Sequence, residues 1–362
     1  MTTQLIEANK NKPPAAALSF KKFRKGLNGG LLTLLTVGIL GLFLSPFLYM
    51  LFTSLKSPEQ MTQQGSPIYP AKPATFEYQG QTLDVYKVPL PDKSLKELAM
   101  LKPGRTQSTF IDPQNPNAAP ILWQGAWRSL ERPWTWSPTW SNFSTVWTTI
   151  NFPNLLWNTT FYAIMTEIGT LISCVLVAYG FSRFRYPGRD FLFIVMISTI
   201  FLPATVTLIP TYTFFTKIGW VGTWLPLIVP AFFANAYDVF LLRQYFMILP
   251  RDLDEAAMID GAGPLRILWL VILPQSLPAL VAITVFHIVW AWNDFFGPLI
   301  YLSTKPELQP ISVALSQFNG IYGTKPTLIQ AGALMAMIAP LILFALAQRF
   351  FVQGIVITGV EK

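Results

Sequence analysis

Long apolar runs alternate with short polar segments along this chain. Six of the runs reach the roughly 20 mainly apolar residues that a helix needs to cross the hydrocarbon core of a bilayer. The pattern predicts an all-α integral membrane protein with six transmembrane helices. We place these helices at residues 29–52, 155–182, 191–215, 224–247, 272–302 and 330–351.

The longest polar segment, residues 53–151, differs from these runs because it is rich in Pro, Gln, Asn and Thr. Alternating residues at 75–78 and 82–88, with Gly80 between them, favour two strands joined by a turn. Residues 94–101 are expected to form one short helix. We interpret residues of about 60–132 as an insertion outside the cytoplasm, either a small β-rich unit or a partly ordered loop.

Basic residues indicate how the chain is oriented. Residues 1–28 form a basic tail, and the second span is followed by Arg183, Arg185 and Arg189. Because Lys and Arg accumulate on the cytoplasmic side, both features predict a cytoplasmic N-terminus. Six spans then return the C-terminal tail, residues 354–362, to the same side. Residues 152–353 form the expected core with five of the spans.

Composition supports the membrane class and excludes several kinds of site. The chain is 52% hydrophobic and 12% charged, whereas soluble domains carry about 25% charged residues. Its net charge of +8 does not indicate nucleic acid, because basic residues flank cytoplasmic helix ends. The single cysteine, Cys174, excludes an internal disulfide and a thiolate zinc site, and no other metal site is expected. The single histidine, His287, is interpreted as a packed or hydrogen-bonded residue.

A charge-bearing stretch at residues 249–271 separates the fourth and fifth spans. Pro250 favours a break in the preceding helix. Asp252 and Glu255 have the spacing of a capping box, and Gly261 favours a helix end. The expected helix of about two turns is too short to be stable alone. It forms either a surface turn or a docking element that another protein holds.

Three motifs in this chain resemble those of ABC-importer permeases of the carbohydrate, or maltose, type. They are E-A-A-x-x-x-G at 255–261 with Ile-Leu-Pro at 272–274, the segment AYGFSRFRYPGR at 178–189, and W-N-D-F at 292–295 with Pro-Leu at 298–299. The similarity covers most of the chain outside residues 60–132, where such permeases usually have a much shorter loop. The chain resembles the shorter of the two permeases of a maltose-type importer.

The resemblance implies the partners of the chain. They are a second permease subunit, two ATPase subunits, an extracytoplasmic solute-binding protein and the lipids of a prokaryotic plasma (inner) membrane. ATP and Mg²⁺ would be used by the ATPases, because this chain has no G-x-x-x-x-G-K-[ST] loop. No catalytic residue and no cofactor of its own are expected. The residues implied to contact an ATPase are Glu255, Ala256, Ala257, Asp260 and Gly261.

Polar side chains inside spans are candidates for the translocation pathway of a sugar or polyol, because a polar group in lipid is costly. These candidates are Tyr212, Asn235, Asn293 and Asp294, for which hydrogen bonding between helices is an equal alternative. Glu167 is expected to share a proton or hydrogen bond with a neighbour. Three alternatives stay open: an ion-coupled transporter that uses Glu167, Asp238 and Asp294, a permease for a non-sugar solute, and a scaffold or enzyme that acts through the inserted loop.

Overall fold

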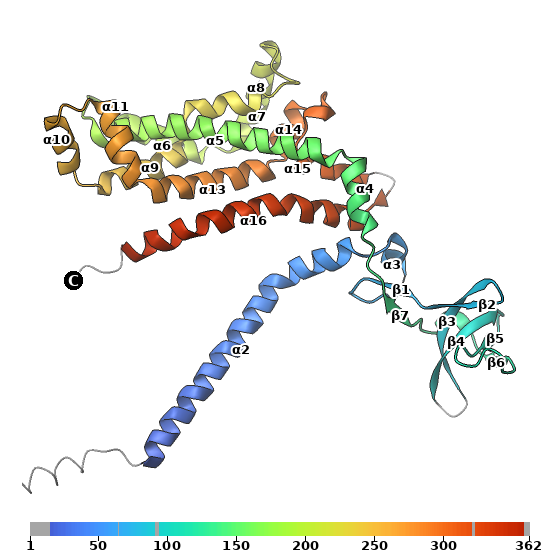
Figure 1. Ribbon diagram of the computed structural model, residues 1–362. Helices are drawn as coiled ribbons and strands as arrows, with labels where there is room; N and C mark the ends of the chain where they lie inside the picture. Colours follow the sequence, from blue (N-terminus) through green and yellow to red (C-terminus); the bar gives the residue numbers. More distant parts are fainter. Residues whose placement is uncertain (1–14, 64, 91–93, 321–322, 358–362) are drawn as a thin grey trace, which may run out of the picture.

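The computed structural model describes residues 15–63, 65–90, 94–320 and 323–357 (Figure 1). The first part of the predicted N-terminal tail and the last residues of the C-terminal tail lie outside this range. The described chain is mostly helical. It consists of a helical bundle, a long helix that extends from the bundle, and a β-structured segment at one end (Figure 1).

Four helices lie side by side in the bundle. They are α5 (Phe152–Arg183), α9 (Ala236–Ile248), α13 (Leu277–Asn293) and α16 (Pro326–Ile357). One buried cluster surrounds Tyr162 and Trp292, and a second surrounds Leu242 and Phe246. The outer faces carry exposed Ile, Leu and Phe side chains. Such a surface suits lipid or a partner helix better than water.

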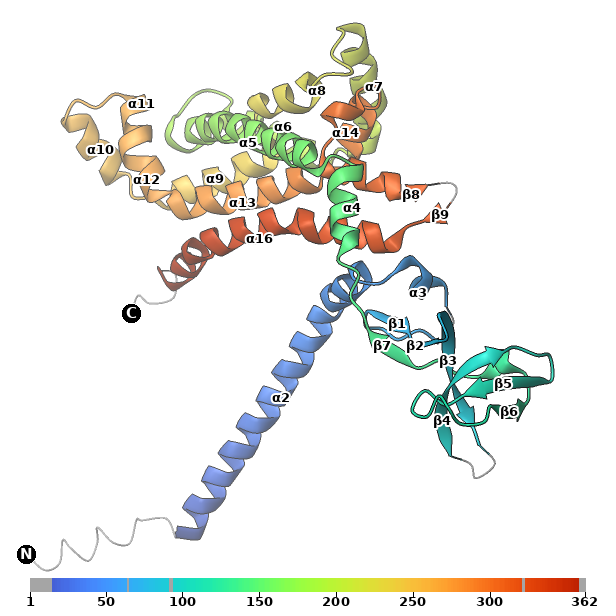
Figure 2. The same cartoon turned by 45° about the vertical axis from the view of Figure 1, so that its right-hand side comes forward.

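The first long helix, α2 (Ala15–Ser54), begins well before the predicted span at residue 29. Its C-terminal end meets α16, and the rest extends away from the bundle in both views (Figures 1 and 2). Residues 30–49 are all exposed. A helix that is apolar on every side requires another apolar surface around it.

The number of membrane crossings depends on how two bent pairs are counted. Four helices are long and apolar enough to cross a membrane, and two further pairs, 189–201 with 205–217 and 264–275 with 277–293, bend by 98° and 79°. If each pair forms one span, the described residues contain six. The predicted count therefore stays a prediction.

Proline explains the first bend but not every proline breaks a helix. The helix α6 (Arg189–Ser198) continues as η2 (Thr199–Phe201), and α7 (Ala204–Lys217) begins directly after Pro203. Pro210 lies inside α7 without ending it. The second bend follows α11 (Pro264–Ile267), η4 (Leu268–Ile272) and α12 (Leu273–Gln275), and lies at Ser276 before α13.

The fourth apolar run is interrupted in its middle. It consists of α8 (Leu225–Ile228), η3 (Val229–Phe233) and α9. Between η3 and α9, Ala234 has φ of 57°, a conformation that is uncommon for a residue other than glycine. The ring of Phe232 lies so close to Gly169 of α5 that a Cβ atom at Gly169 would be 2.7 Å from it. The interruption is therefore packed tightly against α5.

The described part of the inserted segment contains seven strands, β1 (Ala71–Pro73), β2 (Thr75–Tyr78), β3 (Gln81–Pro89), β4 (Leu95–Lys102), β5 (Gln107–Ile111), β6 (Ile121–Gln124) and β7 (Trp134–Trp136). Strands β2 to β6 form one antiparallel sheet in sequence order, and β1 pairs with β7 (Figure 2). The predicted strands at 75–78 and 82–88 are confirmed, and Gly80 turns between them with φ of 79°.

The helix predicted for residues 94–101 is wrong, because this segment is strand β4. Leu, Lys, Glu, Ala and Met favour helices locally, but β4 pairs with β3 and β5 on its two sides. Its Leu98 and Ala99 are fully buried. Pairing and burial in the sheet outweigh the local preference.

Two short helices connect the insertion to the bundle. In α4 (Ser141–Thr149), the buried side chain of Asn142 donates hydrogen bonds to the carbonyl oxygens of Ser54 and Lys56, at 2.7 and 2.8 Å. In α3 (Pro58–Thr62), the Gln60 side chain donates a hydrogen bond to the Tyr69 carbonyl oxygen and accepts one from the Ala71 N–H. The insertion is thus held to the end of α2 by buried polar contacts.

The remaining elements cover the same end of the bundle. They are α14 (Phe296–Tyr301), η5 (Pro306–Leu308), α15 (Ile311–Ala314), η6 (Leu315–Phe318), β8 (Asn319–Gly320) and β9 (Gly323–Thr324). The short helix α10 (Asp252–Ile259) lies at the opposite end (Figure 1).

Candidate functional site

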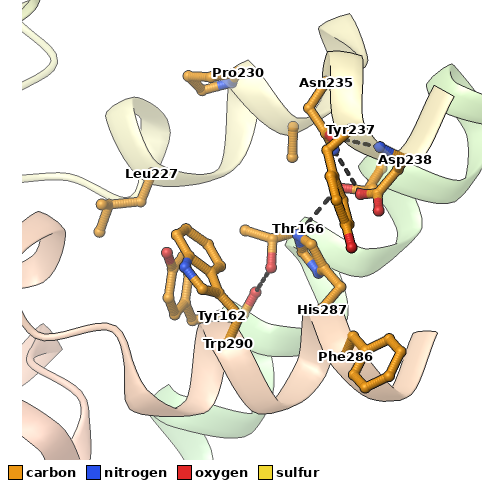
Figure 3. Close-up of a pocket in the computed structure, with 12 residues that line it drawn as sticks. Tyr162, Thr166, Leu227, Pro230, Asn235, Tyr237, Asp238, Phe286, His287 and Trp290 are labelled. Carbon is orange, nitrogen blue, oxygen red and sulfur yellow. Dashed lines mark hydrogen bonds between the residues drawn. The ribbon is translucent and has the colours of Figure 1, made fainter. Parts of the chain in front are cut away.

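A stripe of polar side chains runs along one face of α5. Tyr162, Thr166 and Thr170 are four residues apart, so they follow one another on the same side of the helix. The helices α9 and α13 face this stripe with Asp238 and His287 (Figure 3). The three helices enclose a cavity between them.

The cavity has a volume of about 520 Å³, within the range of about 300–1,000 Å³ that is typical of small-molecule sites. Its wall combines apolar and aromatic side chains with a few polar groups, as such sites usually do. The lining residues are Tyr162, Thr166, Thr170, Leu227, Pro230, Ala231, Asn235, Tyr237, Asp238, Phe286, His287 and Trp290.

The interruption at Ala234 exposes the start of α9 to this cavity. Asn235 caps α9, since its Oδ1 accepts a hydrogen bond from the backbone N–H of Asp238 at 2.9 Å. The amide nitrogen of Asn235 donates to Oδ2 of Asp238 at 2.6 Å. Asp238 lies in the first turn of α9, where the helix dipole favours negative charge. The two residues form a compact polar group on the cavity wall.

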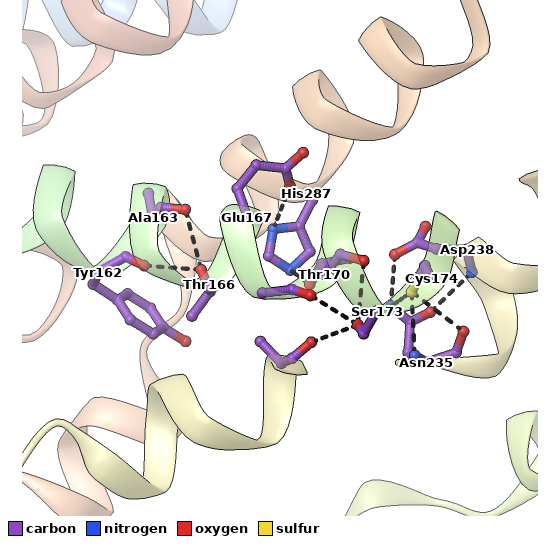
Figure 4. Close-up of polar contacts among 12 residues, drawn as sticks. Tyr162, Ala163, Thr166, Glu167, Thr170, Ser173, Cys174, Asn235, Asp238 and His287 are labelled. Carbon is purple, nitrogen blue, oxygen red and sulfur yellow. Dashed lines mark hydrogen bonds and ion pairs between the residues drawn. The ribbon is translucent and has the colours of Figure 1, made fainter. Parts of the chain in front are cut away.

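The neighbouring part of α5 holds the interrupted backbone in place. Ser173 donates a hydrogen bond to the Ala231 carbonyl oxygen at 3.0 Å, and the Asn235 N–H donates to the Cys174 sulfur at 3.4 Å (Figure 4). These contacts satisfy backbone groups that no longer have a helical partner, which matters most inside a membrane.

Glu167 and His287 form a close pair, with His287 on the cavity wall and Glu167 behind it. Nδ1 of His287 lies 3.0 Å from Oε2 of Glu167, within ion-pair distance but without hydrogen-bond alignment (Figure 4). Nε2 of His287 lies 3.2 Å from the Thr170 hydroxyl oxygen. The expectation that His287 is a packed or hydrogen-bonded residue is confirmed. Glu167 lies within ion-pair distance of His287, but the expected shared proton or hydrogen bond is not found among the described residues.

Tyr162 connects the cavity to Asp294. Its hydroxyl donates a hydrogen bond to Oδ2 of Asp294 at 2.7 Å, and its ring stacks on Trp224 at 5.9 Å. The backbone carbonyl oxygen of Asp294 accepts a hydrogen bond from Ser312 at 2.6 Å. Asp294 therefore ties three elements together next to the cavity without lining it.

The four predicted pathway residues occupy different environments. Asn235 lines the cavity, and Asp294 is one contact away from it. Tyr212 instead stacks on Tyr301, with ring centroids 6.0 Å apart. The Asn293 amide bonds the Val289 carbonyl oxygen of its own helix at 2.7 Å. Tyr212 and Asn293 are not among the residues that line the cavity.

Sequence reasoning missed most of the cavity wall. The spacing of Tyr162, Thr166 and Thr170 within an apolar run was a readable signal, because it predicts one polar helix face. His287 and Trp290 reach the cavity because α13 packs against α5. No local sequence pattern indicates this packing. Among the described residues, no group of three or more His, Cys, Asp and Glu side chains is placed to hold a metal ion.

The helix α10, at the far end of the bundle, includes most of the residues implied to contact an ATPase. Its N-cap is Arg251 and has no side-chain hydrogen bond, so the predicted capping box of Asp252 and Glu255 is wrong. Arg251 itself has helical dihedral angles, and its carbonyl oxygen accepts the bonds from the N–H groups of Asp254 and Glu255. The first turn is thus closed by backbone groups.

An ion pair holds α10 against the end of α5. Oδ2 of Asp254 lies 3.1 Å from Nε of Arg183, and Arg183 also donates to the Leu249 carbonyl oxygen at 3.2 Å. Burial raises the pKa of Asp254, and the positive charge of Arg183 opposes this shift. The predicted end of the helix is confirmed, because Gly261 has φ of 77°.

One face of α10 has no partner among the described residues. Glu255, Ala256 and Asp260 are exposed, together with Met258 and Ile259, whereas Ala257 packs inward against the cluster around Phe246. Ile259 is 87% exposed. An apolar side chain this exposed, flanked by acidic groups, suits a contact with another protein.

Comparisons with known proteins agree with this architecture. Residues 169–357 match the family "Binding-protein-dependent transport system inner membrane component". The chain is 35% identical over 201 residues to the osmoprotective compounds uptake permease protein GgtD of Synechocystis, covering 55% of this chain and 67% of GgtD. It is 31% identical over 211 residues to the sn-glycerol-3-phosphate transport system permease protein UgpE of Brucella melitensis, covering 58% and 74%.

A solved structure extends the likeness over nearly the whole fold. A chain of a bacterial ABC transporter involved in the import of the acidic polysaccharide alginate superposes with a TM-score of 0.64 at 21% identity. The match covers 91% of this chain and 98% of that chain. At this identity the match concerns the fold alone.

Proposed function

This chain belongs to the family of inner membrane components of binding-protein-dependent transport systems, as the permease subunit of an ABC importer, and from this premise we propose that it carries a sugar or polyol across the membrane by alternating access. The observation that carries the proposal is the cavity of about 520 Å³ on the interrupted fourth apolar run. Transporter sites near the middle of a membrane are typically built on such discontinuous helices.

The cavity wall suits a polyhydroxylated solute. The hydroxyl groups of Thr166 and Thr170 and the polar atoms of Asn235 and Asp238 can accept or donate hydrogen bonds, while Trp290 and Phe286 offer flat apolar surface. A hydroxyl-rich ligand needs both, because each buried hydroxyl must find a partner and the remaining surface must be covered. The other three candidates would take part in the translocation pathway indirectly. Asp294 would act through Tyr162 and Tyr212 through Tyr301. Asn293 would act from the C-terminal end of α13.

The energy would come from two partner ATPase subunits that use ATP and Mg²⁺. The exposed face of α10 supports this part of the proposal, with Glu255, Ala256, Asp260 and the turn at Gly261 accessible to a partner. Ala257 would support the docked helix from its inner side. Closure of the ATPases would then move α10, and with it α5 through the contact between Asp254 and Arg183.

The two other partners would bind at distinct places. The exposed residues 30–49 of α2 supply an apolar surface for the second permease subunit. The β-structured insertion lies at the opposite end of the bundle from α10 (Figure 1), which supports an extracytoplasmic position and a contact with the solute-binding protein. Both termini would then be cytoplasmic.

Transport by the assembled complex tests the function. The chain would be purified with its partners, reconstituted in proteoliposomes and supplied with the solute-binding protein and labelled neutral sugars and polyols. We expect uptake that requires ATP and that an uncoupler does not change. Uptake that survives without ATP and is abolished by the uncoupler would instead support the ion-coupled alternative, with Glu167, Asp238 and Asp294 as coupling groups.

Labelling tests the proposed orientation. A Gln114→Cys substitution in a Cys174→Ser background places one thiol on the insertion. We expect this thiol to react with an impermeant maleimide in intact cells. Labelling only after the membrane is permeabilised would contradict an extracytoplasmic insertion.

A further inference from the structure

The charges around the cavity are of one sign. Among the twelve lining residues, Asp238 is an acid and none is Lys or Arg (Figure 3). His287 is the one lining side chain that can become cationic near neutral pH, and its Nδ1 faces Glu167. A protonated His287 is thus paired with Glu167, and no other cationic side chain lines the wall near Asp238.

Asp238 is well placed to act on a solute. The residue is only 8% exposed, and its Oδ2 is held by the Asn235 amide. No hydrogen bond to Oδ1 is found within the described part of the chain. A carboxylate oxygen on a cavity wall that has no donor favours a ligand that brings one, such as a hydroxyl or ammonium group.

Two further carboxyl groups lie directly behind the cavity wall. Glu167 lies behind His287, and its Oε1 is buried without a hydrogen-bond partner in the described structure. Asp294 lies behind Tyr162. When these groups are ionised, their charges add to that of Asp238, and the wall is then negative whether or not His287 is protonated.

The arginine on α9 does not compensate these charges. Arg243 lies five residues after Asp238, but its guanidinium group stacks on Phe193 at 4.0 Å and its Nε donates to the Phe181 carbonyl oxygen. It is therefore directed to α5 and α6 and away from the cavity. Arg183 is likewise engaged with Asp254 at the end of α5.

We propose that this cavity selects solutes by charge: it admits uncharged or cationic polyhydroxylated solutes and excludes those that carry a phosphate or carboxylate group, with Asp238 as the specificity-determining residue. The inference rests on the proposed sugar or polyol function and narrows its substrate class. An anionic solute would have to leave water and approach Asp238 in a medium of low dielectric, where repulsion between like charges is strong. A hydroxyl group would instead donate to Oδ1.

Charged thiol reagents measure this selectivity without knowledge of the natural solute. Tyr237→Cys in a Cys174→Ser background places a single thiol of this chain on the cavity wall of the assembled complex, at a position that is 58% exposed. Its reaction rates would be measured with a cationic, an anionic and a neutral methanethiosulfonate, each relative to the rate of the same reagent with a simple thiol in solution. We expect the cationic reagent to be favoured over the anionic one by at least about tenfold, since charges a few ångströms apart interact by more than 1 kcal/mol at the reduced dielectric of a protein.

Variants at Asp238 identify the source of the preference. In the same background, Asp238→Asn should abolish most of the preference for the cationic over the anionic reagent, and Asp238→Glu should retain this preference. Asp190→Asn is the matched control, because the Asp190 side chain is 75% exposed and lies outside the cavity. Equal rates for the two charged reagents, an unchanged preference in Asp238→Asn, or no reaction with any reagent would each overturn the proposal.

A second measurement separates this inference from the proposed function. Protection of the thiol from the neutral reagent would be compared for trehalose and trehalose 6-phosphate, and for glycerol and sn-glycerol 3-phosphate. Protection by the neutral members alone supports both proposals. Equal protection by both members of a pair would overturn the charge selectivity and leave a sugar or polyol pathway standing. A cationic preference without protection by any sugar or polyol would count against the proposed function and not against the charge of the cavity.

Discussion

Asp254 on α10 and Arg183 at the end of α5 are joined by an ion pair of 3.1 Å, in which the Arg183 side chain is 5% exposed and that of Asp254 is 14% exposed. The pair is the direct polar link between the short helix and the longest buried helix of the bundle. In the proposed mechanism this pair would couple movement of α10 to α5.

Removing either partner is expected to have unequal effects. Arg183→Ala leaves the carboxylate of Asp254 without its cation, and we expect a loss of about 1–3 kcal/mol in the free energy of unfolding. Asp254→Asn leaves the guanidinium group of Arg183, which is 5% exposed and cannot lose its charge, without an anion, so it should cost more than Arg183→Ala, where Asp254 can take up a proton. Thermal unfolding of the purified chain compares them, and a smaller loss in Asp254→Asn than in Arg183→Ala would contradict this order.

The same pair predicts a dependence of stability on pH. The folded pKa of Asp254 is raised, so the folded chain binds its proton more tightly than the unfolded chain. The contribution of Asp254 to the free energy of unfolding is therefore greatest at a pH below the pKa of its unfolded state. This contribution is lost as the pH rises through the pKa of the folded state. Asp254→Asn should remove this part of the dependence of stability on pH. The same pH dependence of thermal unfolding in the wild-type chain and in Asp254→Asn would contradict the prediction.

The exposed face of α10 leads to a prediction about partner binding. Glu255 is exposed, so Glu255→Lys should leave the thermal stability of the chain unchanged. If the face docks on an ATPase, losing a charged hydrogen bond there costs about 1–3 kcal/mol and weakens binding about tenfold or more. Co-purification of the ATPase and transport would be measured at equal membrane levels.

The chain offers a matched control for that experiment. Glu307→Lys makes the same change at an exposed glutamate at the other end of the bundle, with a side chain that is 63% exposed. It should not affect ATPase binding. Gly261→Asp should weaken binding like Glu255→Lys, because Gly261 has φ of 77° and a side chain there is strained. Normal ATPase binding in both α10 variants would mean that this stretch is only a turn.

Local sequence patterns predicted some elements correctly. They failed where contacts between residues distant in the sequence determine the structure. The alternation at residues 75–88 was sufficient to predict β2 and β3, whereas Leu98 and Ala99 of β4 became strand residues only through pairing with two neighbours. Asn235 was identified as a polar residue in a span. Its contact with Asp238, however, depends on the interruption at Ala234, and no glycine marks that position in the sequence.

The close contact between α5 and the interrupted run yields a further prediction. A Cβ atom at Gly169 would lie 2.7 Å from the Phe232 ring and 3.1 Å from the Ala231 backbone. Gly169→Ala must therefore displace the segment that leads into the cavity, at a cost of about 1–3 kcal/mol. Gly180→Ala, in the same helix, meets no atom within 4 Å and should be neutral or slightly stabilising. Thermal unfolding and ligand protection of the Tyr237→Cys thiol measure both effects, and equal behaviour of the two variants would contradict the packing described here.

The last prediction concerns the attachment of the inserted segment. Asn142 is 5% exposed, and its amide nitrogen bonds the Ser54 and Lys56 carbonyl oxygens at 2.7 and 2.8 Å. Asn142→Ala leaves both buried acceptors without these donors, so we expect a loss of about 1–3 kcal/mol. The loss should be local, because the sheet has its own buried core around Val88 and Phe110.

Hydrogen exchange distinguishes a local from a global effect. In Asn142→Ala, amides at residues 54–60 and 137–146 should exchange faster, and those of β3 to β5 should be unchanged. Asn117→Ala, at an exposed position of the insertion, serves as the control and should change neither group. Faster exchange throughout β3 to β5 would show that the sheet depends on this attachment for its folding. Unchanged exchange at both places would mean that the two hydrogen bonds of Asn142 do not hold the insertion to α2. Because α4 also packs against α16, where Val146 lies near Gly332, loosening at Asn142 is expected to weaken any mechanical coupling between the insertion and the bundle while leaving both folded.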